Sequence, residues 1–314
     1  MIKINSMSFQ EALQSHDLEA IRAIPKSDLH NHGLMGGRLS VMGDLSGLEI
    51  NPFSYGELGI PGINRWIAES YVPVIKKPGS FENALKAAFI QAKHDGVTVL
   101  EMSIDVSYGV LFNISPAKIV NILQETHQAL APEIEFRPEL GFARVRPVRS
   151  LLQWFEPLLD TGYFKSVDLY DDESAQPIGN FRELYRFVRE SSLKCKAHAG
   201  EFGTAASVRE AVEELGLEVV QHGIGAAESP EVMKWLALNK VQLNVCPYSN
   251  IRLNRVGSYA VHPIRILYDH GVKVTINTDD VMLFDAGNSE QYLELFRSGL
   301  FSPDELDEIR RNGL

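Results

Sequence analysis

The stretch DLHNHG contains the first residues of this chain that could do chemistry together. His30 and His32 end an apolar-leaning run over residues 23–32, which we expect to be a strand. Side chains at positions i and i+2 of a strand point to the same face, so both imidazoles should enter one space. A metal ion is the obvious reason to place two imidazoles side by side. Two histidines are not a metal site, so the other ligands must come from elsewhere in the chain.

Further polar residues stand at the ends of other β-rich runs. His198 ends one run in KAHAGE, His222 ends another in VVQHGIG, and Asp279 and Asp280 follow a third in VTINTDD. A single histidine at a strand end is more often a structural residue with a hydrogen-bond partner. The TDD sequence alone is more often a turn. Their shared position at strand ends is what points to a common site.

The pattern of elements predicts how these ends meet. Eight short β-rich runs alternate with segments of helical period at 115–132, 180–192, 204–216, 229–240 and 262–271. This alternation predicts a parallel sheet, and eight units favour a closed (β/α)₈ TIM barrel, with residues 1–314 as one domain. Closure places the last strand beside the first, and therefore Asp279 near His30 and His32. The expected strands are 23–32, 97–105, 134–142, 164–170, 194–199, 218–222, 241–246 and 272–278.

Three histidines and one aspartate suit a borderline cation such as Zn²⁺, with water completing its shell. Zinc brings the deprotonation of a bound water close to neutral pH, and a hydrolase also needs a proton donor. Glu201 lies three residues after His198 and could be that donor, or else an acid in the first turn of the next helix. His222 is either a ligand or the base that activates water. The other histidines lie in or beside predicted helices and are interpreted as structural or surface residues: His16, His94, His127, His262 and His270.

Residues 33–62 differ from the rest of the chain, with eight glycines and two prolines after the first predicted strand. An insertion at this point would lie over the C-terminal mouth of the barrel, so we interpret it as a lid-like segment. A long surface connection is the alternative.

Composition limits the partners. The chain has 314 residues, 45% of them hydrophobic, and a net charge of −11, which disfavours a nucleic-acid partner. Its two cysteines imply no disulfide framework and favour a reducing compartment. The N-terminus lacks an apolar signal-peptide core, and no run of 18 apolar residues predicts a membrane span. We expect a cytoplasmic protein that acts on a small molecule; the sequence does not indicate its oligomeric state.

Five segments, in this order, resemble the adenosine deaminase family of metal-dependent amidohydrolases: PKSDLHNH, HAGE, QHGIGA, NVCPYSN and HPIRILYDHGVKVTINTDD. The resemblance implies a (β/α)₈ barrel with one zinc ion that hydrolytically removes ammonia from 6-aminopurines. It further implies that Glu201 protonates the purine ring, that His222 activates water, and that Asp280 hydrogen-bonds a ring nitrogen. The implied zinc ligands are His30, His32, His198 and Asp279.

The chain departs from the family pattern where the substrate would be recognised. Leu34 or Met35 stands where adenosine-specific members carry an aspartate that holds the ribose, and Asp171 or Asp172 replaces a glycine that meets the purine. Ser103 takes the place of a frequent arginine. We therefore name Asp171 as a candidate substrate-binding residue and expect adenosine, a modified adenosine or adenine as the substrate.

Three alternatives stay open. The chain could hydrolyse a different amino-heterocycle or amide, but a two-metal amidohydrolase would need a lysine at the end of the fourth strand, and only Lys165, near its start, is present. The other class of zinc deaminase carries H-x-E and P-C-x-x-C motifs, which this sequence lacks. A catalytically silent homologue is the third alternative, and the intact ligand set with Glu201 argues against it.

Overall fold

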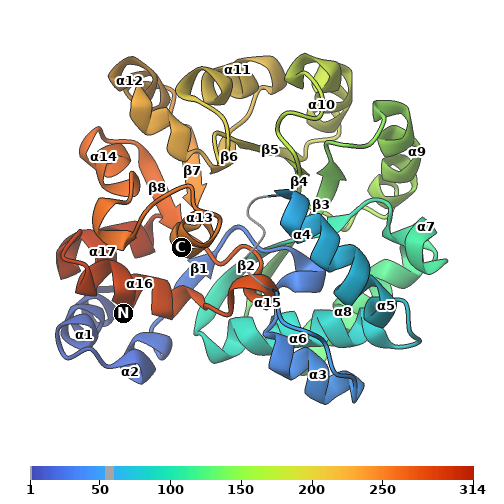
Figure 1. Ribbon diagram of the computed structural model, residues 1–314, viewed down its shortest axis with the longest axis horizontal. Coiled ribbons are helices and arrows are strands. Elements are labelled where there is room, and N and C mark those ends of the chain that lie inside the picture. The colour runs from blue at the N-terminus through green and yellow to red at the C-terminus, as the bar shows by residue number, and fades with distance from the viewer. Residues whose placement is uncertain (1, 54–59) are drawn as a thin grey trace.

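The computed structural model describes residues 2–53 and 60–314, and in it eight parallel strands form a barrel inside a ring of helices (Figure 1). The strands follow one another around the barrel in chain order, so the predicted (β/α)₈ architecture is confirmed. They are β1 (Lys26–Asp28), β2 (Val97–Asp105), β3 (Glu135–Ala143), β4 (Ser166–Tyr170), β5 (Lys194–Ala199), β6 (Val219–His222), β7 (Gln242–Val245) and β8 (Lys273–Ile276).

The helices that follow the strands begin and end at residues the sequence indicates. Ser115 caps α8, Ser229 caps α12, and Thr204 caps α11, which ends at Gly216 with a φ of 65°. The helices after the second strand are α7 (Tyr108–Phe112), α8 (Pro116–Leu130), α9 (Val148–Leu159), η3 (Ile178–Phe181), α10 (Arg182–Glu190), α11 (Ala205–Leu215), η4 (Ile224–Glu228), α12 (Pro230–Leu238), α13 (Pro247–Arg252), η5 (Tyr259–Val261), α14 (Ile264–Asp269), α15 (Val281–Phe284), α16 (Asn288–Arg297) and α17 (Pro303–Arg311).

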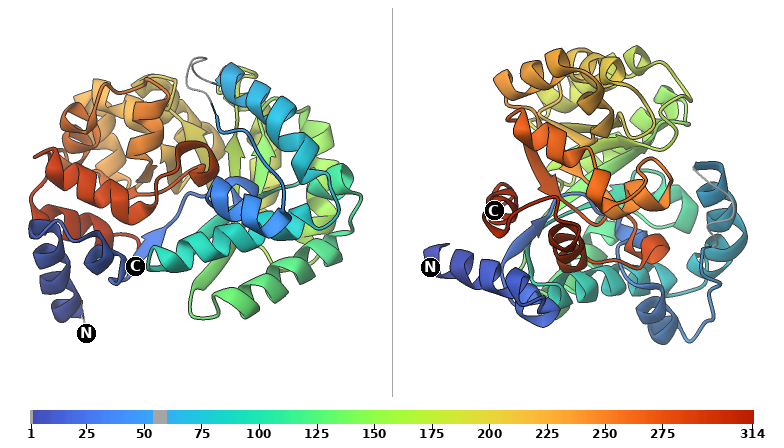
Figure 2. Two further views of the ribbon diagram at one scale, coloured as in Figure 1. Left: turned by 60° about the horizontal axis from the view of Figure 1, so that its bottom comes forward. Right: turned by 60° about the vertical axis from the view of Figure 1, so that its left-hand side comes forward.

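The N-terminal part of the chain packs beside its C-terminal part. Helix α1 contacts α16 and α17, and the two termini lie on the same side of the molecule (Figure 2). Among the described residues, no helix combines the length and apolar character needed to cross a membrane. The helices of this part are α1 (Ile2–Gln14), α2 (Leu18–Arg22), η1 (Gly33–Met35), α3 (Leu39–Ser46), α4 (Ile60–Trp66), η2 (Ile67–Tyr71), α5 (Val72–Ile75) and α6 (Ser80–His94).

The segment 33–62 after β1 contains η1, α3 and the start of α4. Ile60 and Ile63 of α4 line a cavity at the C-terminal mouth of the barrel. Residues 54–59 of this segment lie outside the described residues. That the segment opens and closes stays a prediction.

The seam between β1 and β8 is shorter than the sequence predicts. We expected strands over 23–32 and 272–278, but the regular strands are Lys26–Asp28 and Lys273–Ile276. Among the described residues no backbone ladder joins β1 to β8, and side chains bridge the seam instead: the Asn277 carboxamide accepts from Leu29 N (2.8 Å), and the Asp28 carboxylate accepts from Thr278 N (3.1 Å). The strands' backbones meet in an isolated bridge between Asn31 and Asp279. The candidate metal ligands of β1 and β8 therefore follow their strands rather than lying within them.

A buried ion cluster fills the barrel below the mouth. Lys196 is fully buried and contacts the carboxylates of Glu101 on β2 and Glu139 on β3, and Ser166 donates to Glu139 (2.7 Å). Lys196 lies two residues before His198 on β5, so both side chains share the inner face. The cluster therefore forms the layer on which the polar residues of the mouth rest.

Replacing Lys196 with Met should lower the free energy of unfolding by about 3–5 kcal/mol, because it leaves the buried carboxylate of Glu139 without its cation and that of Glu101 with Arg137, at 3.4 Å, as its remaining cation. Denaturant unfolding at neutral pH measures this loss. Lys194→Met, on the same strand but less buried, is the matched control and should cost less than about 1 kcal/mol. A similar small loss for both variants would contradict the role given to the cluster.

Candidate active site

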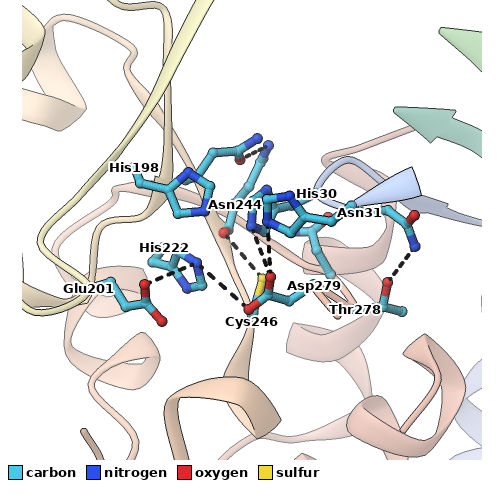
Figure 3. Close-up of polar contacts among 12 residues, drawn as sticks. His30, Asn31, His198, Glu201, His222, Asn244, Cys246, Thr278 and Asp279 are labelled. Carbon is cyan, nitrogen blue, oxygen red and sulfur yellow. Dashed lines mark hydrogen bonds and ion pairs between the residues drawn. The ribbon is translucent and has the colours of Figure 1, made fainter. Parts of the chain in front are cut away.

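The pair of histidines that follows β1 meets the aspartate that follows β8. Asp279 Oδ1 lies 3.4 Å from His30 Nε2 and 3.3 Å from His32 Nε2. Backbone pairing fixes this approach, since Asp279 N donates to His30 O at 2.9 Å. Figure 3 shows the Asp279 carboxylate directed at His30, with His198 and His222 nearby. Closure of the barrel thus brings together residues about 250 positions apart.

His198 of β5 completes a cluster of three histidines. Its ring centroid lies 4.6 Å from that of His30 and 5.5 Å from that of His32. One potential ligand nitrogen from each of these three residues lies within 4.8 Å of the others. His198 Nδ1 lies 3.1 Å from Asp168 Oδ2, so this nitrogen donates to the carboxylate and Nε2 keeps its lone pair. This arrangement therefore leaves Nε2 of His198 available to bind a metal ion.

Buried charge and an orphaned nitrogen show that the cluster suits a cation. His30 Nε2 is buried without a hydrogen-bond partner among the described residues. Burial lowers the pKa of His30 to about 4, which keeps the ring neutral. Burial also opposes ionisation of Asp279, but the neighbouring imidazoles of His30 and His32 outweigh it and hold the pKa of this carboxyl well below its usual range. An ionised carboxylate beside a neutral imidazole is the donor set of a zinc site.

His32 favours its charged form, in which a proton occupies the position that a bound cation would take. Burial lowers its pKa, but the carboxylates of Asp280 and Asp279 outweigh burial and raise the pKa to about 10. A divalent cation at this point would take the place of the imidazolium proton. Cys246 also approaches His30, His222 and Asp279, but burial raises the pKa of its thiol well above the usual value, which disfavours the thiolate that binds metals.

Glu201 and His222 form a second pair beside the metal-binding cluster. His222 Nε2 lies 3.7 Å from Glu201 Oε2 and 3.9 Å from Asp279 Oδ2, and its Nδ1 is 3.3 Å from the Asn250 side-chain nitrogen. Burial, aided by Asp279, raises the pKa of Glu201 well above its ordinary value. Burial likewise lowers the pKa of His222 well below its ordinary value. Burial therefore favours the protonated form of Glu201 and the unprotonated form of His222.

A cavity of about 90 Å³ opens directly onto these groups. Since a water needs roughly 10–15 Å³ of such volume, the cavity holds several waters or part of a flat ring. Asp280 lies in its wall with Oδ1 buried and unpartnered among the described residues, and burial raises the pKa of this carboxyl to about 7. The cavity is lined by His32, Met35, Ile60, Ile63, Asn64, Ile67, Tyr170, Asp171, His198, Glu201, His222, Leu253, Asp279, Asp280 and Phe284.

Asp171, the candidate substrate-binding residue, also lies in the cavity wall. Its φ is 81°, its carboxylate is hydrogen-bonded by Asn64 of α4, and burial raises its pKa. Of the eight residues singled out from the sequence, all but His30 line this cavity, and His30 lies behind it against Asp279. Leu34 belongs to the hydrophobic core, so of the two residues at the expected ribose position only Met35 faces the cavity.

Two acids near the site were missed in the sequence. Asp168, fully buried on β4, orients His198; the signal available was a charged residue inside an otherwise apolar strand. Glu173 binds the backbone of the turn that carries Glu201, and nothing in its sequence context indicates that contact. A larger cavity of about 370 Å³, lined by Arg144, Glu173 and residues of α11, contains none of the candidate metal ligands.

Comparison with known proteins agrees with this geometry. Residues 65–314 match the model of the family described as adenosine deaminase. The chain belongs to this family. A putative adenosine/adenine deaminase of Treponema pallidum is 34% identical over 285 residues, covering 91% of this chain and 95% of that protein. The family assigns this chain to the hydrolytic deaminases, which act on C–N bonds.

Solved structures of related proteins show the same fold. An adenine deaminase from Arthrobacter aurescens superposes with a TM-score of 0.82 at 24% identity, covering 92% of both chains. An amidohydrolase from Burkhoderia ambifaria with bound Zn has a TM-score of 0.80 at 22% identity, covering 93% of this chain and 85% of that one. At these identities the likeness establishes the barrel fold.

Replacing Asp168 with Ala should weaken zinc binding by about 10–100-fold, because His198 loses the carboxylate that fixes its tautomer and orientation. Titration of zinc against a competing chelator measures the affinity. Asp168→Asn keeps an acceptor oxygen at the same place and should retain more of it. Wild-type zinc affinity in the alanine variant would show that Asp168 does not orient His198.

Proposed function

We propose that this chain catalyses the zinc-dependent hydrolytic deamination of a 6-aminopurine, namely adenosine, a modified adenosine or adenine, to the 6-oxo compound and ammonia. One observation carries the proposal. The buried carboxyl of Glu201 and the buried imidazole of His222 lie 3.7 Å apart at the edge of a cluster of three histidines and one aspartate. Hydrolysis of an amino-substituted ring needs each of these parts. Membership of the adenosine deaminase family supports the same chemistry.

One zinc ion per chain is the proposed cofactor, held by His30, His32, His198 and Asp279. Bound zinc would supply Lewis acidity, which brings the deprotonation of water near to pH 7. The orphaned Nε2 of His30 and the ionised Asp279 fit this assignment. His222 is assigned outside the ligand set.

The chain's own residues then move the protons. Neutral His222 accepts a proton from the attacking water, and protonated Glu201 donates its proton to the ring nitrogen beside the attacked carbon. His222 passes its proton to the departing amino group, which leaves as ammonia. Glu201 recovers a proton from the new hydroxyl group as the C=O bond forms. Both residues return to their starting state, and one water is consumed.

Asp280 and Asp171 are proposed to recognise the ring. Asp280 lines the cavity, its Oδ1 has no partner among the described residues, and its pKa of about 7 would let it accept from or donate to a purine nitrogen. On the side where ribose would lie, Met35 and the isoleucines of α4 offer apolar surface. An apolar wall cannot strongly select for a hydroxyl group, so we propose that ribose recognition is weak.

The proposal extends to the compartment and the kind of partner of the enzyme. Both cysteines are buried and unpaired, and the net charge is −11. These properties favour a cytoplasmic enzyme whose partner is a small-molecule substrate rather than a nucleic acid or a membrane.

Zinc content is the first test of the function. Protein purified without added metal should contain about one zinc per chain by elemental analysis, and chelation should remove both zinc and activity. His198→Ala should lose most of the metal, whereas His222→Ala should keep it and lose turnover. Two metals per chain, or full activity without any, would contradict the proposed centre.

Glu201→Gln should keep fold and zinc but lose about 10²–10⁴-fold in kcat, because glutamine has the same shape and cannot deliver the proton. Ammonia release measures turnover, and zinc content and melting temperature serve as controls. Turnover near that of the wild type would make Glu201 a helix-end acid only.

Steady-state kinetics on adenosine, 2′-deoxyadenosine, 5′-modified adenosines and adenine should identify the substrate. We expect kcat/KM for adenine or a modified adenosine to equal or exceed that for adenosine, because the described residues offer apolar surface on the sugar side. A strong preference for adenosine over its 5′-deoxy analogue would overturn the argument about the sugar side. Absence of turnover across the whole panel would overturn the proposed function.

A further inference from the structure

The turn that carries Glu201 is gripped by a carboxylate from another strand. Glu173, in the loop after β4, accepts hydrogen bonds from three consecutive backbone N–H groups: Gly200 N (2.7 Å), Glu201 N (2.8 Å) and Phe202 N (2.9 Å). Charge-assisted bonds of this kind are about twice as strong as neutral ones. Three successive amides pointing at one anion form a concave anion-binding nest, and here a side chain of the protein itself occupies the nest.

A guanidinium holds the other side of the same turn. Arg255, which follows α13, donates from Nε to Glu201 O (3.0 Å) and from Nη2 to Phe202 O (3.5 Å). Its guanidinium carbon also lies 5.2 Å from the centre of the Phe202 ring. The N–H groups of the turn thus face a negative charge, and its carbonyl groups face a positive charge.

The turn needs such support because it leaves the barrel ladder immediately after β5. Gly200 has a φ of 71°, and a Cβ there would lie 2.3 Å from Val208 Cγ2. Its carbonyl accepts from Gly225 N (2.8 Å), but the three amides that follow β5 find their acceptor in Glu173. Without that acceptor, these partly buried N–H groups would be left unpaired, which is unfavourable. A different turn would carry Glu201 away from its place beside His222.

We infer that Glu173 and Arg255 are positioning residues for the proton donor: they fix the backbone of residues 200–202 so that the Glu201 carboxyl faces the ring of the substrate. The inference rests on the proposed function, because it assigns these residues a part in the deamination. Neither lies in the wall of the 90 Å³ cavity, so they act through Glu201 rather than on the substrate. A displacement of about 1 Å at a reacting group can cost about 10²-fold in rate.

Glu173→Gln is the decisive variant. Its carboxamide can still accept at one oxygen, but its NH₂ group would meet another N–H donor, so at least one of the three bonds is lost. We expect kcat to fall about 10–100-fold, with KM within about threefold of the wild type and zinc content unchanged. Adenine is the probe, or adenosine if the wild type prefers it. Glu210→Gln, which removes an exposed carboxylate of α11 from the same 370 Å³ cavity, is the matched control and should leave kcat unchanged.

A double-mutant cycle separates positioning from a general structural effect. If Glu173 acts through Glu201, then Glu173→Gln should cost less than about threefold in the Glu201→Gln background, because the proton donor is already lost. Hydrogen exchange of peptides spanning residues 200–202, followed by mass spectrometry, gives a readout that needs no activity. Exchange there should be faster in Glu173→Gln than in the wild type and unchanged in Glu210→Gln.

Three results would overturn the inference: unchanged kcat in Glu173→Gln, an undiminished loss in the Glu201→Gln background, or unchanged exchange over residues 200–202. If Glu173→Gln does not fold, Arg255→Met decides by the same measurements, because Arg255 is exposed and its removal leaves the core intact. A wild type that deaminates no aminopurine refutes the proposed function instead, and the exchange experiment still reports whether Glu173 holds the turn.

Discussion

The buried carboxylate of Asp279 is the constraint on which this molecule depends. It is only 5% exposed and lies between two imidazoles at the seam of the barrel. Placing an ion in such a position costs several kcal/mol unless it is paired. The two imidazoles do not pair equally with this carboxylate, because burial keeps His30 neutral while the neighbouring carboxylates favour the charged form of His32. A divalent cation would satisfy all three groups at once, so the proposed metal site would also be the electrostatic solution to closing the barrel.

The backbone at the mouth of the barrel adopts left-handed conformations that turn side chains at the strand ends inward. Positive φ angles occur where four strands end: 81° at Asp171, 71° at Gly200, 60° at His222 and 61° at Asp279. Left-handed conformations cost roughly 1–2 kcal/mol for a residue with a Cβ, and such strain persists only where the surroundings over-determine it. Three of these four positions carry a side chain that we assign to the site. The rigid barrel below, with its buried Lys196 cluster, holds these strained residues in place.

The barrel and the candidate site could be predicted because each leaves a local signal in the sequence. These signals are the periodicity of the elements and the polar residues at the ends of the strands. Alternating runs revealed the strands, and polar residues at the ends of those runs revealed the mouth. The same signals overestimated the strands at the seam, where Asn277 and Asp28 replace the backbone ladder with side-chain hydrogen bonds. Asp168 and Glu173 escaped prediction because their partners, His198 and the turn at 200–202, are near only in space. Pairings between distant segments leave no period in the sequence.

The opposite effects of burial on Glu201 and His222 explain how one apolar environment supplies both an acid and a base. Desolvation favours the neutral form of each group, which is the protonated carboxyl for Glu201 and the unprotonated imidazole for His222. The reaction would change both transiently into a carboxylate and an imidazolium. These opposite charges would be separated by only 3.7 Å in a buried site, where they would stabilise each other. The pair is therefore neutral when the substrate binds and mutually attractive at the moment of proton transfer. That advantage exists only while Glu201 stays beside His222, which makes the backbone of its turn part of the chemistry.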